Sequence, residues 1–294
     1  MDLDRPILVI SDLHLGRAGM LEAASMIQPL IDQAGTLIIN GDTAELHVAQ
    51  FRDQARRELD ELRKRCDASN TRLHLLAGNH DPDLVPDRYL QLSAQRIFIT
   101  HGDVIDEAVA PWSDAARRMR RQHRAFLEDL PPAIHDTLEG RFAACRSAAM
   151  AEWSPQGDAG RPSTPLRMLF KPGKIAKVLW FWATCNTRTN AFVEQFAPET
   201  RLILTGHSHR SGIFRRGDRT IVNTGSFGFP GRPLGVVLDQ TGASVHKIIQ
   251  RDGCWDLVEK PIYTDPSVPI ESSSDEAASL STFRTTDAAP RTAV

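Results

Sequence analysis

Short apolar runs in this sequence end abruptly in residues that can bind metal ions. Five such runs end in the segments SDLHLG, NGDTAE, AGNHD, THGD and TGHSH, which are rich in aspartate, asparagine, histidine and glycine. Each run is about five residues long and rich in leucine and β-branched residues, as buried strands are. A single ending of this kind decides little, whereas five of them indicate one shared site.

The residue types at these ends are typical of a transition-metal site. Ligands of open α/β sheets bind at the carboxyl ends of the strands, so polar ends that share one edge converge there. The residues that would converge are Asp12, His14, Asp42, Asn79, His101, His207 and His209. Oxygen and imidazole donors suit Mn²⁺, Fe, Zn²⁺ or Ni²⁺, with Mn²⁺ favoured. Seven donors are too many for one ion that keeps an open position, so the sequence predicts two divalent ions sharing one carboxylate.

The spacing within these ends indicates how the chain would pass the ions. Asp12 and His14 are two residues apart, as are His207 and His209. In an extended segment both members of such a pair point the same way, toward the site. Glycines at 41, 78, 102 and 206 would let the backbone turn sharply beneath the ions.

Each of these residues also has a simpler explanation when it is taken alone. Asp12 and Asp42 could cap helices, Asn79 could occupy a turn, and His101 could be a core histidine bonded to backbone. All of these explanations would have to hold together to remove the site, so we favour the metal centre.

The elements that position the first strand ends alternate between strand and helix. Amphipathic helices are predicted over 19–35 and 47–66, and Pro29 is expected to shorten or kink the first of them. Strand, helix, strand, helix and strand in this order predict a parallel βαβ core.

The middle of the chain has a different character. No strand is evident between 104 and 200, where helices are predicted over 112–130, 131–152 and 165–197. Strands return after residue 200, with Gly217 and Asp218 as a tight hairpin turn.

These patterns divide the chain into three parts. Residues 1–103 and 201–262 would form the catalytic core, and 104–200 a helical insertion. Because the insertion leaves after one polar strand end and returns before another, we expect it to lie over the site as a mobile cap. Residues 263–294 are rich in Ser, Thr, Ala and Pro, and we expect a disordered tail.

Composition limits the classes of partner and the compartment. The net charge of −2 gives no reason to expect specific nucleic-acid binding, and 41% hydrophobic residues allow a sizeable core. The four cysteines form no CxxC pair, which suits reduced thiols in the cytoplasm. No secretory signal is evident, and the longest apolar run, 178–185, is far shorter than the roughly 20 residues that span a bilayer. We expect a soluble cytoplasmic protein, with peripheral binding to the inner face of the membrane left open.

The segments DLH, GDTAE, GNHD, HGD and GHSH, in this order, resemble the five motifs of the calcineurin-like metallophosphoesterase superfamily. The resemblance covers roughly 5–103 and 200–250. It implies an α/β fold in which helices flank a sandwich of two mixed β-sheets, and a dinuclear metal centre. One ion would be held by Asp12, His14 and His209, and the other by Asn79, His101 and His207. Asp42 would bridge them, His80 would be the catalytic histidine, and Asp81 would orient it.

Such a centre has a well-defined chemistry. Two metal ions about 3.5–4 Å apart bind a bridging hydroxide at neutral pH and clamp the phosphoryl oxygens for in-line attack. The metal charge offsets the charge that develops on phosphorus. His80 cannot easily bind the same ion as its neighbour Asn79, so it is free to donate a proton to the leaving oxygen.

Two segments of the insertion are candidates for substrate contacts. RRMRRQHR at 117–124 includes Arg117 and Arg121, and 161–188 combines six basic residues with no acidic one. The second segment interleaves Lys171, Lys174 and Lys177 with three aromatic residues at 180–182, as a membrane-surface helix or an acyl-chain groove would. The alternatives are a solvated helix face for the first segment and packing of the aromatic stripe on the core for the second.

This insertion is similar to the cap of the UDP-2,3-diacylglucosamine pyrophosphatases, which cleave a lipid-bearing nucleotide diphosphate. Those enzymes carry arginine at the position of His80, and their insertion is shorter. The substrate would then be a small or lipid-linked phosphate ester or anhydride, at an anionic membrane surface. A protein phosphatase or a nuclease on the same metal site, and a metal-binding scaffold without turnover, remain alternatives.

Overall fold

Two mixed β-sheets face each other in the computed structural model, which describes residues 5–153, 172–228 and 231–270. The strands of the first sheet are β1 (Ile7–Ile10), β2 (Thr36–Asn40), β3 (Arg72–Leu76), β9 (Leu234–Asp239), β10 (Gly242–Arg251), β11 (Cys254–Leu257) and β12 (Tyr263–Asp265). Those of the second sheet are β4 (Tyr89–Leu92), β5 (Ile97–Thr100), β6 (Leu202–Thr205), β7 (Gly212–Arg216) and β8 (Arg219–Asn223).

Parallel strands form the centre of each sheet. The first sheet has the order β11-β10-β9-β1-β2-β3, with β12 paired to β10, and the second has the order β4-β5-β6-β8-β7. β1, β2 and β3 are parallel, as are β5, β6 and β8, whereas the other neighbours are antiparallel. The predicted parallel βαβ core and the two mixed sheets are therefore confirmed.

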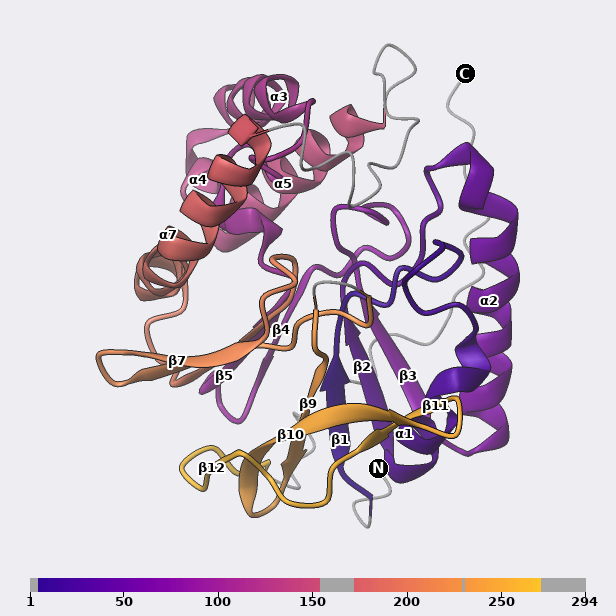
Figure 1. Cartoon of the computed structure of the whole chain (residues 1–294). Coiled ribbons are helices and arrows are strands. Elements are labelled where there is room, and N and C mark those ends of the chain that lie inside the picture. Colours follow the sequence, from indigo (N-terminus) through magenta and orange to yellow (C-terminus); the bar gives the residue numbers. More distant parts are fainter. Residues whose placement is uncertain (1–4, 154–171, 229–230, 271–294) are drawn as a thin grey trace.

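Helices cover the outer faces of both sheets. They are η1 (Ala24–Ile27), α1 (Gln28–Gln33), α2 (Ala49–Ala68), η2 (Asp103–Ile105), α3 (Ala116–Glu128), α4 (Pro132–His135), α5 (Leu138–Glu152) and α7 (Pro172–Phe196). Figure 1 shows α2 on one side of the molecule, and α3, α4, α5 and α7 grouped on the other. Pro29 lies in the first turn of α1, which is much shorter than the expected helix over 19–35.

Alternation along the strands sorts the apolar side chains into three layers. Val9 of β1 and Ile99 of β5 lie in the cluster between the two sheets. Leu8 packs outward with the residues of α1 and α2. Phe98 and Ile203 pack outward with the helices of the insertion. Because side chains alternate with a period of two, β1, β5 and β6 each contribute to two layers.

The insertion is mainly the helical layer of the second sheet. Met119, Phe142 and Val193, from α3, α5 and α7, share one buried cluster with Phe98 and Ile203 of the sheet. A sheet with an apolar outer face must be covered, and these helices cover it. The expected cap is thus for the most part packed on the core. Its residues Trp112, Trp153 and Trp182 contact the segments that follow the core strands.

Two strands were not expected from the sequence. β4 pairs with β5, and β12 pairs with β10. The expected disordered tail was therefore wrong for 263–270, where Val268 and Ile270 are also buried in the cluster between the sheets. Tyr263, Val268 and Ile270 pack in this cluster and anchor the segment, and 271–294 lies outside the described residues.

The predicted hairpin is present, because Arg216 pairs with Arg219 across Gly217 and Asp218. Gly217 has a positive φ of 60°, which glycine adopts at no steric cost. In the described part of the chain, no helix is long and apolar enough to cross a membrane.

Candidate dinuclear metal centre

The polar ends of five parallel strands meet at one edge of the sandwich. β1, β2 and β3 of the first sheet, and β5 and β6 of the second, lead directly into the five segments singled out in the sequence. Asn40, at the end of β2, joins the two sheets here: its Nδ2 donates to the carbonyl oxygens of Thr100 (2.8 Å) and Leu204 (3.3 Å). The topology thus brings together residues far apart in the sequence.

The backbone that carries the candidate ligands is turned, not extended. Asp12, His14, Asp42, His207 and His209 all have φ between 48° and 65°, in the left-handed region. The expectation that Asp12–His14 and His207–His209 are extended was therefore wrong. A non-glycine residue in this region costs on the order of 1–3 kcal/mol, and such strain is typical of functional sites. These turns direct the side chains inward over very short stretches of chain.

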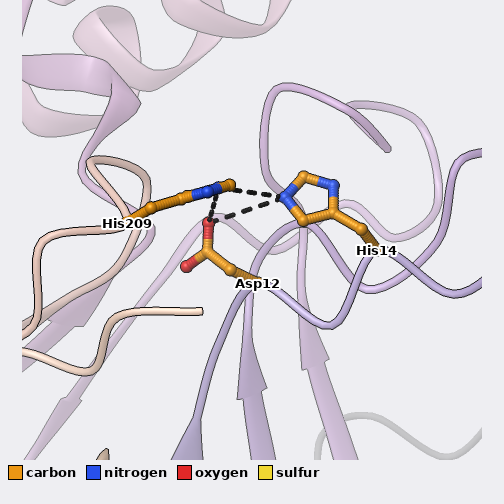
Figure 2. Close-up of side chains that lie close together, drawn as sticks. All are labelled: Asp12, His14 and His209. Atoms are coloured by element: carbon orange, nitrogen blue, oxygen red, sulfur yellow. Dashed lines mark hydrogen bonds and ion pairs between the residues drawn. The ribbon is translucent and has the colours of Figure 1, made fainter. Parts of the chain in front are cut away.

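One cluster of donor atoms contains Asp12, His14 and His209 (Figure 2). Nε2 of His209 lies 3.2 Å from Oδ1 of Asp12 and 3.2 Å from Nε2 of His14. Asp12 and His14 are fully buried, whereas the side chain of His209 is 23% exposed. Two nitrogens and one oxygen thus face a common point at the rim of the site.

A second cluster contains Asp42, His101 and His207, all of them buried. Oδ2 of Asp42 lies 3.2 Å from Nε2 of His101 and 3.7 Å from Nε2 of His14. The same carboxylate oxygen therefore faces both clusters, as a ligand shared by two ions would.

An unpaired polar atom in the site fits a bound ion. Oδ1 of Asn79 is buried and makes no hydrogen bond within the described structure. A buried polar atom without a partner carries a large free-energy cost unless something else binds it. Carboxylate, amide and imidazole donors together suit a divalent transition metal, so the residues present fit two such ions.

The hydrogen bonds of the three buried histidines select which nitrogen is available. Nδ1 of His14 is 3.0 Å from Glu45, and Nδ1 of His101 is 3.0 Å from the carbonyl oxygen of Asn40. Nε2 of His207 is 3.0 Å from the carbonyl oxygen of Val109. Each contact engages one ring nitrogen as donor, which leaves the other to bind an ion and fixes the ring.

For Asp42 and His101, burial and neighbouring charges shift the pKa in opposite directions. Burial would raise the pKa of Asp42, but the charges of His101 and His80 hold it well below its usual range. Burial also opposes charge on His101, yet Asp42 and Asp12 raise the pKa of His101 to about 10. Burial, with His101 nearby, lowers the pKa of His207 to about 4, so this imidazole is neutral. The carboxylates thus favour positive charge at the centre of the site.

Glu45, not Asp81, orients His80. Oε2 of Glu45 lies 3.0 Å from Nδ1 of His80, and its Oε1 contacts His14 and Arg17. Asp81 instead accepts hydrogen bonds from the backbone N–H groups of 43, 44 and 78. The expected role of Asp81 was therefore wrong in this respect: its carboxylate fastens the loops that carry Asp42 and Asn79. Desolvation opposes charge on His80, but Glu45 and Asp42 raise its pKa to about 9.

Two glycines permit the close approach of the ligand loops. A Cβ atom at Gly78 would collide with the carboxylate of Asp42, and one at Gly206 with that of Asp12. Neither position has room for a side chain. Glycine is required there by the packing of the site.

Of the five expected substrate residues, the four in the described part of the chain are not assembled at the site. Arg117 and Arg121 are exposed on α3, and in the described chain neither makes a hydrogen bond or ion pair with a candidate ligand. Their neighbour Arg118 donates to the carbonyl oxygens of 151 and 152 at the end of α5. Lys174 and Lys177 lie in the first turns of α7, and Lys171 lies outside the described residues.

The three consecutive aromatic residues of α7, at 180–182, point in three directions. Phe181 is buried, 4.9 Å from the ring of Trp112, and Trp182 donates from Nε1 to the carbonyl oxygen of Ser208 at 2.9 Å. Trp180 is 54% exposed. Packing on the core thus explains two of the three residues and leaves Trp180 on the surface.

Comparison with known proteins agrees with this geometry. Residues 5–211 match the model of the calcineurin-like phosphoesterase family, and the chain belongs to this family. Enzymes of this class, the metallophosphoesterases, hydrolyse ester or anhydride bonds of phosphate. A search of curated proteins found no match.

Several solved structures are similar to this chain at low sequence identity. A dimetal phosphatase from Danio rerio is 12% identical, with a TM-score of 0.45, over 84% of this chain and 96% of that chain. A predicted phosphoesterase from Streptococcus pneumoniae is 13% identical, with a TM-score of 0.36, over 89% and 98%. Vacuolar Protein Sorting 29 from Cryptosporidium parvum is 12% identical, with a TM-score of 0.38, over 89% and 98%.

Several residues that the structure places at the site could not be assigned to it from the sequence. Glu45, three residues after Asp42 in the same segment, could from the sequence alone either support the site or start the next helix. Arg88 is buried and forms an ion pair with Asp103, which immediately follows the HG pair at the end of β5. Trp112 and Trp153 contact candidate ligand loops from the insertion. No short motif marks these residues, because their partners are distant in the sequence.

Proposed function

We propose that this protein is a dinuclear metal-dependent hydrolase of a small or lipid-linked phosphate ester or anhydride. The observation that carries the proposal is the pair of donor clusters that lie on either side of the carboxylate of Asp42, which faces both of them. One ion would be held by Asp12, His14 and His209, and the other by Asn79, His101 and His207. Two divalent ions, with Mn²⁺ favoured, would activate water at neutral pH and clamp the phosphoryl oxygens for in-line attack.

His80 is the residue that we propose to act on the leaving group. Its side chain is 24% exposed, so a substrate can reach it, whereas the side chains of Asp12 and His14 are fully buried. Glu45 engages Nδ1 of His80, which leaves Nε2 for the leaving oxygen. The backbone N–H of His80 also donates to Oδ1 of Asp42 at 2.8 Å, which ties its position to the shared ligand.

The substrate class is proposed from the surface of α7. Leu179 and Trp180 are 55% and 54% exposed, and Lys174 and Lys177 lie within two turns of them. Exposed apolar and basic residues on one short helical stretch suit an amphiphilic anionic substrate or an anionic membrane surface. A lipid-linked nucleotide diphosphate of the UDP-diacylglucosamine kind, met at the inner face of the cytoplasmic membrane, is the substrate that we propose.

Substitution of the shared carboxylate tests the reaction. Mn²⁺ should stimulate hydrolysis of an aryl phosphate or an aryl phosphodiester by the wild-type protein. Asp42→Asn keeps the size of the side chain but removes its charge, so the rate should fall by about 100-fold or more. Asp60→Asn, at an exposed carboxylate that pairs with Arg63 on α2, is the control and should retain the wild-type rate. Unchanged turnover of pure Asp42→Asn protein would refute the proposed site.

A substrate panel separates the remaining alternatives on the same metal site. It should contain nucleotides, UDP-linked diacyl lipids, phosphopeptides and single-stranded DNA. We expect the highest kcat/KM for the lipid-linked nucleotide diphosphate. Preference for phosphopeptides or for DNA would instead indicate a protein phosphatase or a nuclease.

Charge reversal on α7 tests the lipid-linked substrate. Lys174→Glu with Lys177→Glu should weaken binding to vesicles that contain phosphatidylglycerol by about 10-fold or more, at roughly 1 kcal/mol per basic residue. The KM for the lipid substrate should rise, while hydrolysis of the aryl phosphate should stay near the wild-type rate. The matched control is Lys247→Glu with Lys260→Glu, in and after the strands of the first sheet. If neither vesicle binding nor KM changes, the lipid proposal loses its support.

A further inference from the structure

Three tryptophans of the insertion contact the loops that carry candidate ligands. Trp112 precedes α3, Trp153 follows α5, and Trp182 lies within α7, so they are far apart in the sequence. All three are half-buried. Each lies against a strand end of the core, although the insertion otherwise packs on the outer face of the second sheet.

Trp153 fastens the segment that contains Asn79 and His80. Its Nε1 donates to the carbonyl oxygen of Asn79 at 3.0 Å, and its ring lies 5.4 Å from the ring of His80. On the other side, the ring of His47 stacks on Trp153 with a centroid distance of 5.7 Å and an interplanar angle of 19°. The indole thus has one defined orientation, from which its N–H reaches a single backbone atom.

Trp182 fastens the segment 207–209 in the same manner. Its Nε1 donates to the carbonyl oxygen of Ser208 at 2.9 Å, between two candidate ligands. Arg210, in the adjoining turn, also binds Trp182. Its Nη1 donates to the carbonyl oxygen of Trp182 at 2.9 Å, and its guanidinium lies over the indole ring. His207 and His209 both have positive φ, so this strained turn needs contacts that hold it in place.

Trp112 packs on the ring of a candidate ligand. Its centroid lies 5.1 Å from that of His207, at an interplanar angle of 38°. Phe181 lies 5.8 Å from the same imidazole, edge to face. The two aromatic rings enclose His207, while its Nε2 is held by the carbonyl oxygen of Val109.

We propose that Trp153 and Trp182 are positioning residues of the metal centre. Their indole N–H groups bind the carbonyl oxygens of Asn79 and Ser208, and these contacts keep the candidate ligands of the two loops in the positions that bind the ions. Neither tryptophan is among the candidate ligands, and we propose that they act through the ligands on those loops. The inference rests on the proposed metal centre, and it assigns the insertion a role in metal affinity in addition to substrate contact.

Phenylalanine substitutions test this proposal, because they keep an aromatic ring and remove the N–H group. Partners of metal ligands typically change metal affinity by about 10–100-fold when they are lost. Trp153→Phe and Trp182→Phe should therefore raise the Kd for Mn²⁺ by about 10-fold or more, measured by isothermal titration calorimetry on metal-free protein. Trp180→Phe, on the exposed face of the same helix α7, is the matched control and should bind Mn²⁺ with the wild-type Kd.

A second measurement separates positioning from a loss of fold stability. The Tm of each variant is measured without metal and again with saturating Mn²⁺. If Trp153→Phe and Trp182→Phe lower the metal-free Tm but keep the wild-type Kd and the wild-type rise in Tm with Mn²⁺, the indoles only stabilise the fold and the proposal is overturned. A wild-type Kd in both variants with an unchanged metal-free Tm overturns it equally.

The same titration distinguishes this inference from the proposed function. If the wild-type protein binds two Mn²⁺ ions and the tryptophan variants bind them equally well, only the positioning role fails. If the wild-type protein itself binds fewer than one ion, the metal centre fails and the inference fails with it.

Discussion

Glu45 holds three side chains of the site at once. Its two oxygens contact Nδ1 of His14, Nδ1 of His80 and Nη1 of Arg17 at 3.0–3.1 Å, and the residue is buried. Burial would raise the pKa of Glu45, but His80 and His14 hold it well below its usual range, so the group is a carboxylate. One residue therefore orients both a candidate metal ligand and the proposed proton donor.

Glu45→Gln should impair both of these functions. The amide keeps the size of the side chain, but its nitrogen cannot accept a hydrogen bond from a histidine N–H. We expect the affinity for Mn²⁺ to fall by about 10-fold and kcat by about 10–100-fold. Both are measured on one preparation, by calorimetry and by aryl phosphate hydrolysis. Asp60→Asn removes a carboxylate from an exposed pair with Arg63 on α2 and should change neither quantity, and a Glu45→Gln protein with wild-type values would rule out this role.

At the scale of elements, the edge strand β3 buries an ionisable residue away from the metal centre. His74 pairs with Ile38 of β2 and is 4% exposed. Burial, with a smaller contribution from the nearby Arg72, lowers the pKa of His74 to about 4 from an ordinary value of 6.5. The unfolded chain therefore binds a proton at this residue before the folded protein does. The stability that depends on neutral His74 is complete above pH 6.5 and is lost as the pH falls from 6.5 toward 4.

His74→Leu should make the protein less sensitive to acid. Between pH 7.5 and pH 5, titration of His74 should lower the free energy of unfolding of the wild-type protein by about 2 kcal/mol, and this part of the loss is absent in the variant. Urea unfolding of both proteins at the two pH values measures the difference. The other titrating groups are common to both proteins and cancel. Equal losses in the two proteins would contradict the assignment.

At the scale of the whole molecule, each donor cluster joins the two sheets. Asp12 and His14 follow β1 of the first sheet, whereas His209 follows β6 of the second. Asp42 follows β2, whereas His101 and His207 follow β5 and β6. Bound ions would therefore cross-link the sandwich at one edge, because the ligands of each ion come from both sheets.

Metal binding should accordingly raise the thermal stability of the whole domain. At a metal concentration of about 100 Kd, each site adds about 2.7 kcal/mol to the free energy of unfolding, provided that the unfolded chain does not bind the ion. Two sites should raise Tm by on the order of 10 °C relative to chelator-treated protein. Calorimetry at several Mn²⁺ concentrations measures this rise, and Asp42→Asn should abolish most of it. A wild-type Tm that is independent of Mn²⁺ would argue against the dinuclear site.

The sequence by itself determined the parallel strands and the polar residues at their ends. These are local properties: an apolar run of about five residues defines a buried strand, and the residues that follow it must lie at the edge of the sheet. The resemblance in motif order then grouped these residues by ion, and the structure brings six of them into two clusters and leaves Oδ1 of Asn79 unpaired nearby. The hairpin at Gly217 was equally local.

Only the tertiary structure decided how those residues are held. Asp12 and His207 were expected in extended chain, but strained left-handed turns carry them, because the loops must fold back within a few residues. Glu45 is the partner of His80, whereas Asp81 was predicted, because the partner depends on how the ends of β2 and β3 approach each other. The contact of Trp153 with Asn79 spans 74 positions in the sequence. Such contacts follow from the packing of helices on sheets, which no short segment specifies.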